Sequence, residues 1–220
     1  DVSPSRLFDE ILKLLQTGYG HATFQALNSY GLLSPLFPQT IALLNQSGGA
    51  NYLALINLAL TSTDKRIKQD QSVTPAFLYA ALHWPTVLDR WYALDAEGHG
   101  RSQALAIACS ETLDFNQQFI AIPKRFSITI REIWELQVKL EKRHGRRPDS
   151  TLEHPRFRAG YDFLLLRESA GEVSDGLGEW WTDYQVADEA KRRDLIASIQ
   201  TDEPNQKKRK PRRKFKRSED

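Results

Sequence analysis

With 220 residues and 40% hydrophobic side chains, the chain is long enough to bury a substantial core in one domain or two subdomains. A single cysteine, Cys109, excludes an internal disulfide, and no Cys/His cluster has zinc spacing, so a reducing, cytoplasmic setting is expected. No apolar run approaches the roughly 20 residues of a membrane span, and no signal peptide opens the sequence. Since methionine is absent and the first residue is Asp1, we expect a fragment of a longer protein.

The formal net charge of +2 conceals an asymmetry between the body of the chain and its C-terminus. Nine of the 30 basic and two of the 28 acidic residues fall within 207–220, so 1–206 keeps 21 basic and 26 acidic residues, a charge of −5 beside +7. The nine cations of this tail are Lys207, Lys208, Arg209, Lys210, Arg212, Arg213, Lys214, Lys216 and Arg217. Such a run is typical either of a nuclear localisation signal or of a floppy arm that binds nucleic acid, and taken alone it leaves both open.

Apolar residues at helical spacing, separated by proline and glycine, predict helices throughout the first 187 residues. These helices are expected over about 4–17, 21–30, 37–47, 52–67, 75–84, 87–97, 102–119, 129–144, 155–165 and 177–184. The fifth should end at Trp84-Pro85, because a proline inside a helix removes a backbone hydrogen bond. No alternating strand appears, so the fold class is all-α, an irregular bundle of about nine to ten helices. Apolar residues thin out from Ala187, and 188–220 is predicted to be a disordered basic tail.

The stretch 120–137 is predicted to be a loop that leads into a helix. Thr129 and the glutamate three residues later have the spacing of a capping box, which would start the helix after Thr129. Lys124, Arg125 and Arg131 then gather near a helix N-terminus, where the macrodipole disfavours cations. Helix stability therefore does not explain them. Together with the free N–H groups of the first turn they would form a site for a phosphate.

A second basic helix start follows at Pro155, with Arg156 and Arg158 in the expected first turn. Cations again occupy a position that the macrodipole disfavours. Two such sites flanking one helix favour a joint surface that tracks the phosphates of a nucleic acid. The alternative is that both are ordinary solvated helix ends.

Patterns typical of catalysis or metal binding are weak. Asp95 and Glu97 have the spacing of a metal-binding carboxylate pair on a strand, but they end a predicted helix and no Gly-Ser phosphate loop precedes them. The five histidines are scattered, and the G-x-x-x-x-G-K, G-x-G-x-x-G and G-x-S-x-G motifs are absent. We therefore expect no catalytic residue, no metal ligand and no cofactor site in this chain.

Several specific motifs occur together in this sequence, namely Ser3–Glu10, Gly18-Tyr19-Gly20, Ala121–Arg125, Leu152–Ala159, the tandem Trp180-Trp181 and the basic tail. In combination they resemble the C-terminal half of the bacterial poly(A) polymerase I family, class II nucleotidyltransferases related to the CCA-adding enzymes, and the resemblance covers most of the chain. It implies the RNA-binding body of a polynucleotide adenylyltransferase, an enzyme that adds AMP from ATP to RNA 3′ ends. The nucleotidyltransferase head, for which Mg²⁺ and ATP are implied, is missing from this sequence.

The resemblance also implies an organisation and a set of partners. Residues 1–17 would end a neck, 18–187 would form the RNA-binding body, and 188–220 would be the tail. The implied partners are RNA 3′ ends, the protein's own head and RNA-decay proteins. Arg6 and Glu10 would form an ion pair that supports the nucleotide pocket from the neck, although an ordinary surface pair fits their spacing equally well. Two other functions stay open, a helical protein-interaction scaffold with a targeting tail and the body of a CCA-adding enzyme.

Overall fold

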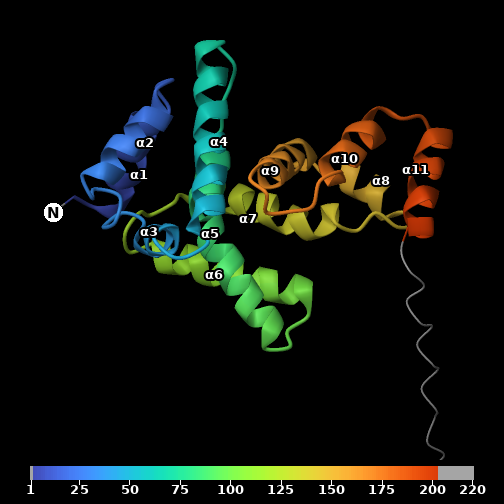
Figure 1. Ribbon diagram of the computed structural model, residues 1–220. Helices are drawn as coiled ribbons and strands as arrows, with labels where there is room; N and C mark the ends of the chain where they lie inside the picture. Colours follow the sequence, from blue (N-terminus) through green and yellow to red (C-terminus); the bar gives the residue numbers. More distant parts are fainter. Residues whose placement is uncertain (1, 203–220) are drawn as a thin grey trace, which may run out of the picture.

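The computed structural model describes residues 2–202, which form eleven α-helices and no strand (Figure 1). This confirms the all-α class. The helices are α1 Pro4–Leu15, α2 Gly20–Ser29, α3 Pro38–Leu44, α4 Gly49–Lys68, α5 Pro75–Ala96, α6 Arg101–Asn116, α7 Lys124–Leu140, α8 Arg147–Leu152, α9 Phe157–Ser169, α10 Leu177–Val186 and α11 Glu189–Asp202. None of the described helices is long and apolar enough to cross a membrane.

The central helix is α5, which packs against α3, α4, α6 and α7. It runs without a break through Pro85, so the predicted division into two helices is wrong. Burial explains the difference, because every residue from 78 to 88 is buried and packing holds this segment helical. Side chains from neighbouring helices also donate hydrogen bonds to backbone carbonyls of α5 in the turn before Pro85. Trp134 donates to the carbonyl of Ala80 at 3.1 Å, and Thr40 donates to that of Leu82 at 2.9 Å.

Two hydrophobic cores organise the rest of the molecule. The larger one gathers α1 to α7, and its aromatic centre stacks Phe8 of α1 on Tyr79 of α5 and on Phe126 of α7, with ring centroids 4.9 and 5.4 Å apart. The smaller one lies at the other end of α7, where Trp180 and Trp181 of α10 pack with α9. In Figure 1, α1–α3 lie on one side of α4 and α5, and α8–α11 lie on the other side.

A buried polar seam joins the two cores, and we define it by Trp84, Gln137, Arg167 and Glu172. Arg167 donates to Glu172 at 2.8 Å and to Gln137 at 3.1 Å. Glu172 also accepts from the indole N–H of Trp84 at 2.6 Å. The seam therefore fixes α9 against both α5 and α7, and with it the position of the first turn of α9.

Beyond α10 the structure corrects the expected boundary of the tail. Residues 189–202 form α11, whose Leu195 and Ile196 pack on the smaller core, so the first part of the segment predicted to be disordered is helical. The carbonyl of Leu195 accepts a hydrogen bond from Trp180 at 3.2 Å. The short helix α8 was also missed. The nine basic tail residues from 207 to 217 lie outside the described residues.

Candidate nucleic-acid interface

The first basic helix start lies six residues earlier than the capping-box pattern predicts. Helix α7 begins at Lys124 after Pro123, and Thr129 is inside the helix, where its hydroxyl donates to the carbonyl of Arg125 at 3.4 Å. The predicted capping box is therefore wrong. Two features favour the earlier start. Proline presets a helical φ at Pro123, and Phe126 in the first turn is anchored on the aromatic centre of the larger core.

The three cations expected at this helix start have different surroundings. Lys124 and Arg125 are exposed in the first turn, and the guanidinium of Arg125 lies 4.7 Å from the ring centre of Phe126. Arg131 is half-buried two turns later and donates to the hydroxyl of Ser110 on α6 at 3.0 Å. Lys124 and Arg125 thus remain beside free N–H groups, whereas Arg131 braces α7 against α6.

The second basic helix start is close to the expected one. Arg156 is the N-cap of α9 and Arg158 is in its first turn, and both side chains are exposed. Arg156 pairs with Glu132 of α7 at 3.3 Å, and Arg158 pairs with Asp162 at 3.0 Å. Glu132 lies seven residues after Arg125, which places both on one side of α7, roughly 10 Å apart along the helix axis. The two basic starts are thus linked through one side of α7.

A groove joins the start of α9 to the end of α4. Its volume is about 760 Å³, and its wall includes Lys65 and Arg66 of α4 together with Arg156 and Arg158. Both nitrogens Nε and Nη2 of Arg66 donate to the carbonyl of Ser72, at 3.2 and 3.1 Å, and this fixes the loop between α4 and α5. Apolar side chains line the same groove, among them Val73, Phe77, Leu165 and Leu166. We call it the α4–α9 groove.

Lys65 and Arg66 were missed by the reasoning from sequence. Cations that oppose a helix dipole stand out in a sequence, whereas these two lie in the last turn of α4, where cations suit the dipole. Only the approach of α9 in the folded chain brings them beside Arg156 and Arg158.

The expected ion pair between Arg6 and Glu10 is wrong. Glu10 pairs with Lys13 at 2.9 Å. The hydrogen bond from Lys13, followed by its charge, lowers the pKa of Glu10. The relevant side chains are exposed and lie on the outer side of α1, opposite the buried Phe8 and Ile11. The role of Arg6 and Glu10 in supporting a nucleotide pocket stays a prediction.

Side chains typical of catalysis are dispersed or enclosed in the part of the chain that the structure describes. No group of three or more His, Cys, Asp or Glu gathers there that could hold a metal ion. Cys109 is buried in α6, and this burial raises the pKa of its thiol to about 12. Glu97 lies 3.5 Å from Arg90 at the end of α5, as part of a surface ion pair.

These observations define an all-helical module with a cation-lined groove between α4 and α9. Two family models match the chain. The model described as "Polymerase A arginine-rich C-terminus" matches residues 97–216, and the one described as "Probable RNA and SrmB- binding site of polymerase A" matches residues 1–44. The chain belongs to the poly(A) polymerase family that these models describe, which confirms the resemblance seen in its motifs.

Individual relatives agree with this assignment. The chain is 40% identical to poly(A) polymerase I of Haemophilus influenzae over 218 residues, and 37% identical to that of Escherichia coli O157:H7 over 223 residues. It is 35% identical to poly(A) polymerase I of Salmonella typhimurium over 223 residues. These alignments cover 97 to 100% of this chain and 48% of each relative. The chain thus spans about half the length of the curated relatives it matches.

Proposed function

We propose that this chain is the RNA-binding C-terminal part of a polynucleotide adenylyltransferase, an enzyme that adds AMP from ATP to the 3′ ends of RNA. The relatives that support this proposal carry the name poly(A) polymerase I and are about twice as long. In this proposal the nucleotidyltransferase head, with its ATP and Mg²⁺, is a separate part of the longer protein. The donor groups of residues 2–202 do not cluster as a metal site requires, so no catalytic step is assigned to them.

The observation that carries the proposal is the composition of the α4–α9 groove. Its four cations come from two segments about 90 residues apart in the sequence, and its remaining wall combines apolar side chains, such as Phe77 and Leu165, with polar ones. Single-stranded nucleic acid suits this combination, because cations follow the phosphates while apolar and aromatic side chains contact the bases. Arginine forks also bind phosphate through two parallel hydrogen bonds. The chain's own residues would therefore hold and orient the RNA without reading its sequence.

Two further basic regions extend this proposed surface. Lys124 and Arg125 lie at a helix start, where exposed N–H groups and positive charge together favour a phosphate. The tail cations from Lys207 to Arg217 would capture RNA from a distance, because the rest of the chain has a net charge of −5. The match of the arginine-rich family model continues through residue 216 and so includes most of this tail.

A salt titration of RNA binding tests the proposal. The 220-residue chain and its Arg156→Ala/Arg158→Ala variant are titrated with fluorescent oligo(A) and with a mixed-sequence RNA of equal length. We expect weaker binding of both RNAs, and a slope of log affinity against log salt that is shallower by up to about 1.4, because each single-strand phosphate contact contributes about 0.7.

The matched control is Arg90→Ala. Arg90 is an ion-paired surface arginine whose partners, Glu111 and Glu97, lie outside the groove. This variant should leave the salt slope unchanged. If the wild-type chain does not bind RNA, or if the groove variant and the control have equal slopes, the proposal is wrong.

A further inference from the structure

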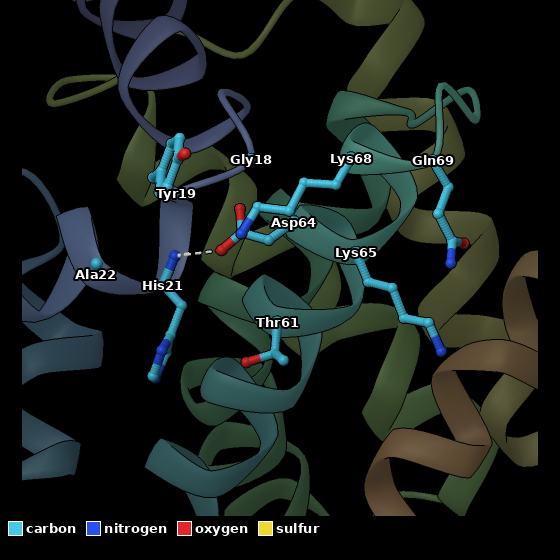
Figure 2. Close-up of a pocket in the computed structure, with 9 residues that line it drawn as sticks. All are labelled: Gly18, Tyr19, His21, Ala22, Thr61, Asp64, Lys65, Lys68 and Gln69. Atoms are coloured by element: carbon cyan, nitrogen blue, oxygen red, sulfur yellow. Dashed lines mark hydrogen bonds between the residues drawn. The ribbon is translucent and has the colours of Figure 1, made fainter.

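A second concavity adjoins the α4–α9 groove across the last turn of α4 (Figure 2). Its volume is about 430 Å³, and it lies between the start of α2 and residues 61–69 at the end of α4. Lys65 and Gln69 line both concavities, so the two meet at this turn. We call the second one the Tyr19 pocket.

Tyr19 is an exposed aromatic residue on a tightly fixed backbone. Its side chain is 66% exposed. On one side Gly18 has a φ of +85°, and on the other a Cβ at Gly20 would collide with the carbonyl of Leu15. Neither position accepts a side chain without strain. The fold thus enforces the geometry of this loop, although the Tyr19 ring adds little to the core.

Hydrogen bonds to helix α4 also hold this loop in place. The carboxylate of Asp64 on α4 accepts hydrogen bonds from the backbone N–H groups of Gly20 at 2.7 Å and His21 at 3.0 Å, the latter drawn in Figure 2. Asp64 is itself buried. The acidic group of the pocket is therefore already satisfied by the start of α2, and the backbone that carries the tyrosine ring is fixed before any ligand arrives.

One lysine lies over this ring, and a second one lines the same pocket. The ammonium of Lys68 lies 4.7 Å from the ring centre of Tyr19, whereas the exposed side chain of Lys65 extends away from the ring (Figure 2). Within residues 2–202, neither lysine forms an ion pair with a carboxylate. An exposed contact between lysine and an aromatic ring is weak, so Lys68 can exchange the ring for a stronger anion. An exposed aromatic face on a fixed backbone, in a pocket with unpaired cations, matches the way proteins bind single-stranded nucleic acid.

We propose that the Tyr19 pocket is a nucleotide subsite for single-stranded RNA. A base stacks on the ring of Tyr19, and its phosphate lies between Lys65 and Lys68. The strand then crosses the last turn of α4 and enters the α4–α9 groove, with Lys65 contributing to both places. This inference rests on the proposed RNA-binding function and adds a defined position and path for the strand.

The test separates contacts with bases from contacts with phosphates. The 220-residue chain and its Tyr19→Ala and Tyr19→Phe variants are titrated with oligo(A) and with an abasic ribose-phosphate oligomer of the same length. Tyr19→Ala should weaken oligo(A) binding by about 5- to 150-fold, the range of base–aromatic stacking, and leave abasic binding unchanged. Tyr19→Phe keeps the ring and should bind both oligomers as the wild type does.

Two other variants complete the design. Tyr30→Ala removes a tyrosine that is 80% exposed and lies at the far end of α2, outside the pocket, and it should change neither affinity. Lys68→Ala should weaken the binding of both oligomers and lower the salt slope by about 0.7. Its exposed side chain can be removed without disturbing the core.

The outcomes distinguish this inference from the function on which it rests. If the wild type binds oligo(A) and Tyr19→Ala binds it equally well, the subsite is refuted and the RNA-binding function stands. An equal loss for oligo(A) and the abasic oligomer also refutes the stacking contact. If the wild-type chain binds neither oligomer, both the function and the subsite are wrong.

Discussion

Arginine side chains have opposite surroundings in the seam between the two cores and in the α4–α9 groove. In the seam, Arg167 is 1% exposed, and its guanidinium is bound to Glu172 and Gln137. In the groove, the side chains of Arg156 and Arg158 are 50% and 72% exposed, and each is paired with one carboxylate at the surface.

This difference shows what a positive charge can do in each place. A guanidinium whose N–H groups are bound inside the protein can position helices but cannot reach a ligand. An exposed ion pair contributes little to stability, so its arginine can exchange a carboxylate for a phosphate at small cost. Burial and hydrogen-bond partners, rather than residue type, therefore separate the structural cations of this chain from those proposed to bind RNA.

Loss of the buried arginine should produce the largest effect on stability. Arg167→Ala leaves Glu172, whose side chain is only 9% exposed, without its cation, and breaking a buried pair typically costs about 3–5 kcal/mol. Urea denaturation at neutral pH measures this change. Arg193→Ala, which removes a 72% exposed arginine, is the control and should cost less than about 1 kcal/mol. Equal losses would mean that the seam has no special role.

A second buried group, the imidazole of His83, should make the folded chain less stable in acid. His83 packs against the rings of both Phe37 and Tyr79, and neither of its nitrogens has a hydrogen-bond partner within the described part of the chain. Burial lowers the pKa of His83 to about 4, from an ordinary value of 6.5. Below pH 6.5 the unfolded chain therefore binds a proton that the folded chain does not, and stability falls as the pH drops from 6.5 to 4.

The expected loss is about 3 kcal/mol over that interval, since each unit of pKa difference corresponds to about 1.4 kcal/mol. Denaturation midpoints between pH 7 and pH 4 measure it. In His83→Leu, which keeps a buried side chain of similar size, this component of the pH dependence should disappear. The same acid sensitivity in wild type and variant would show that other groups cause it.

On the ligand-binding side, the tail should have the largest effect on salt dependence. Removing residues 205–220 deletes nine cations, and if half of them contact phosphates the salt slope should fall by roughly three. The free energy of unfolding of the remaining chain should not change. An unchanged slope would instead favour a targeting role for the tail.

The start of α7 should give a smaller change of the same kind. Lys124→Ala/Arg125→Ala removes two exposed cations that the helix dipole disfavours, so stability should change by less than about 0.5 kcal/mol. RNA binding should weaken for all sequences alike, with a slope shallower by about 1.4. Thermal unfolding and a salt titration measure the two effects. Lost stability with unaltered RNA affinity would place these residues with Arg167 on the structural side.

Local pattern predicted most of the helices, and tertiary packing explains the errors. The positions of proline and glycine predicted the limits of the first four helices to within a few residues of the observed ones. The pattern failed at Pro85, where burial on all sides keeps α5 continuous, and at Thr129, where the contact of Phe126 with the core starts α7 earlier. It also missed α11, whose few apolar residues are sufficient because they meet an existing core.

The candidate site could be predicted only in part, for a similar reason. Arg156 and Arg158 were found because they oppose a helix dipole, whereas Lys65 and Arg66 suit theirs and gave no signal. Tyr19 was noted in the sequence only as part of the Gly18-Tyr19-Gly20 motif, and no binding role was predicted for it. Its exposure on a fixed loop is a property of the folded chain. Glu10 pairs with Lys13 three residues later and not with Arg6 four residues earlier. Both spacings allow an ion pair on a helix, so the sequence alone does not decide between them.

The smallest predicted effect concerns the loop that shapes one wall of the groove. Helix α4 ends with backbone hydrogen bonds from Asp70 to the carbonyl of Ile67 at 3.0 Å and from Gln71 to that of Arg66 at 2.9 Å. This pattern requires a left-handed residue after the helix, and Asp70 supplies it with a φ of 54°. Asp70→Gly removes the steric cost of a Cβ there but increases the freedom of the unfolded chain.

The net expectation for Asp70→Gly is a gain of about 0.5 kcal/mol, and Asp70→Ala should lose a similar amount because alanine tolerates this conformation poorly. Urea denaturation of the two variants measures the difference. Asp70→Asn, which keeps the shape and removes the charge, is the control for RNA binding. Any rise in RNA affinity shared by the Asn and Gly variants reflects the lost negative charge near the groove, whereas the stability gain should belong to glycine alone. If the alanine variant is as stable as the glycine variant, the left-handed turn does not limit the stability of this loop.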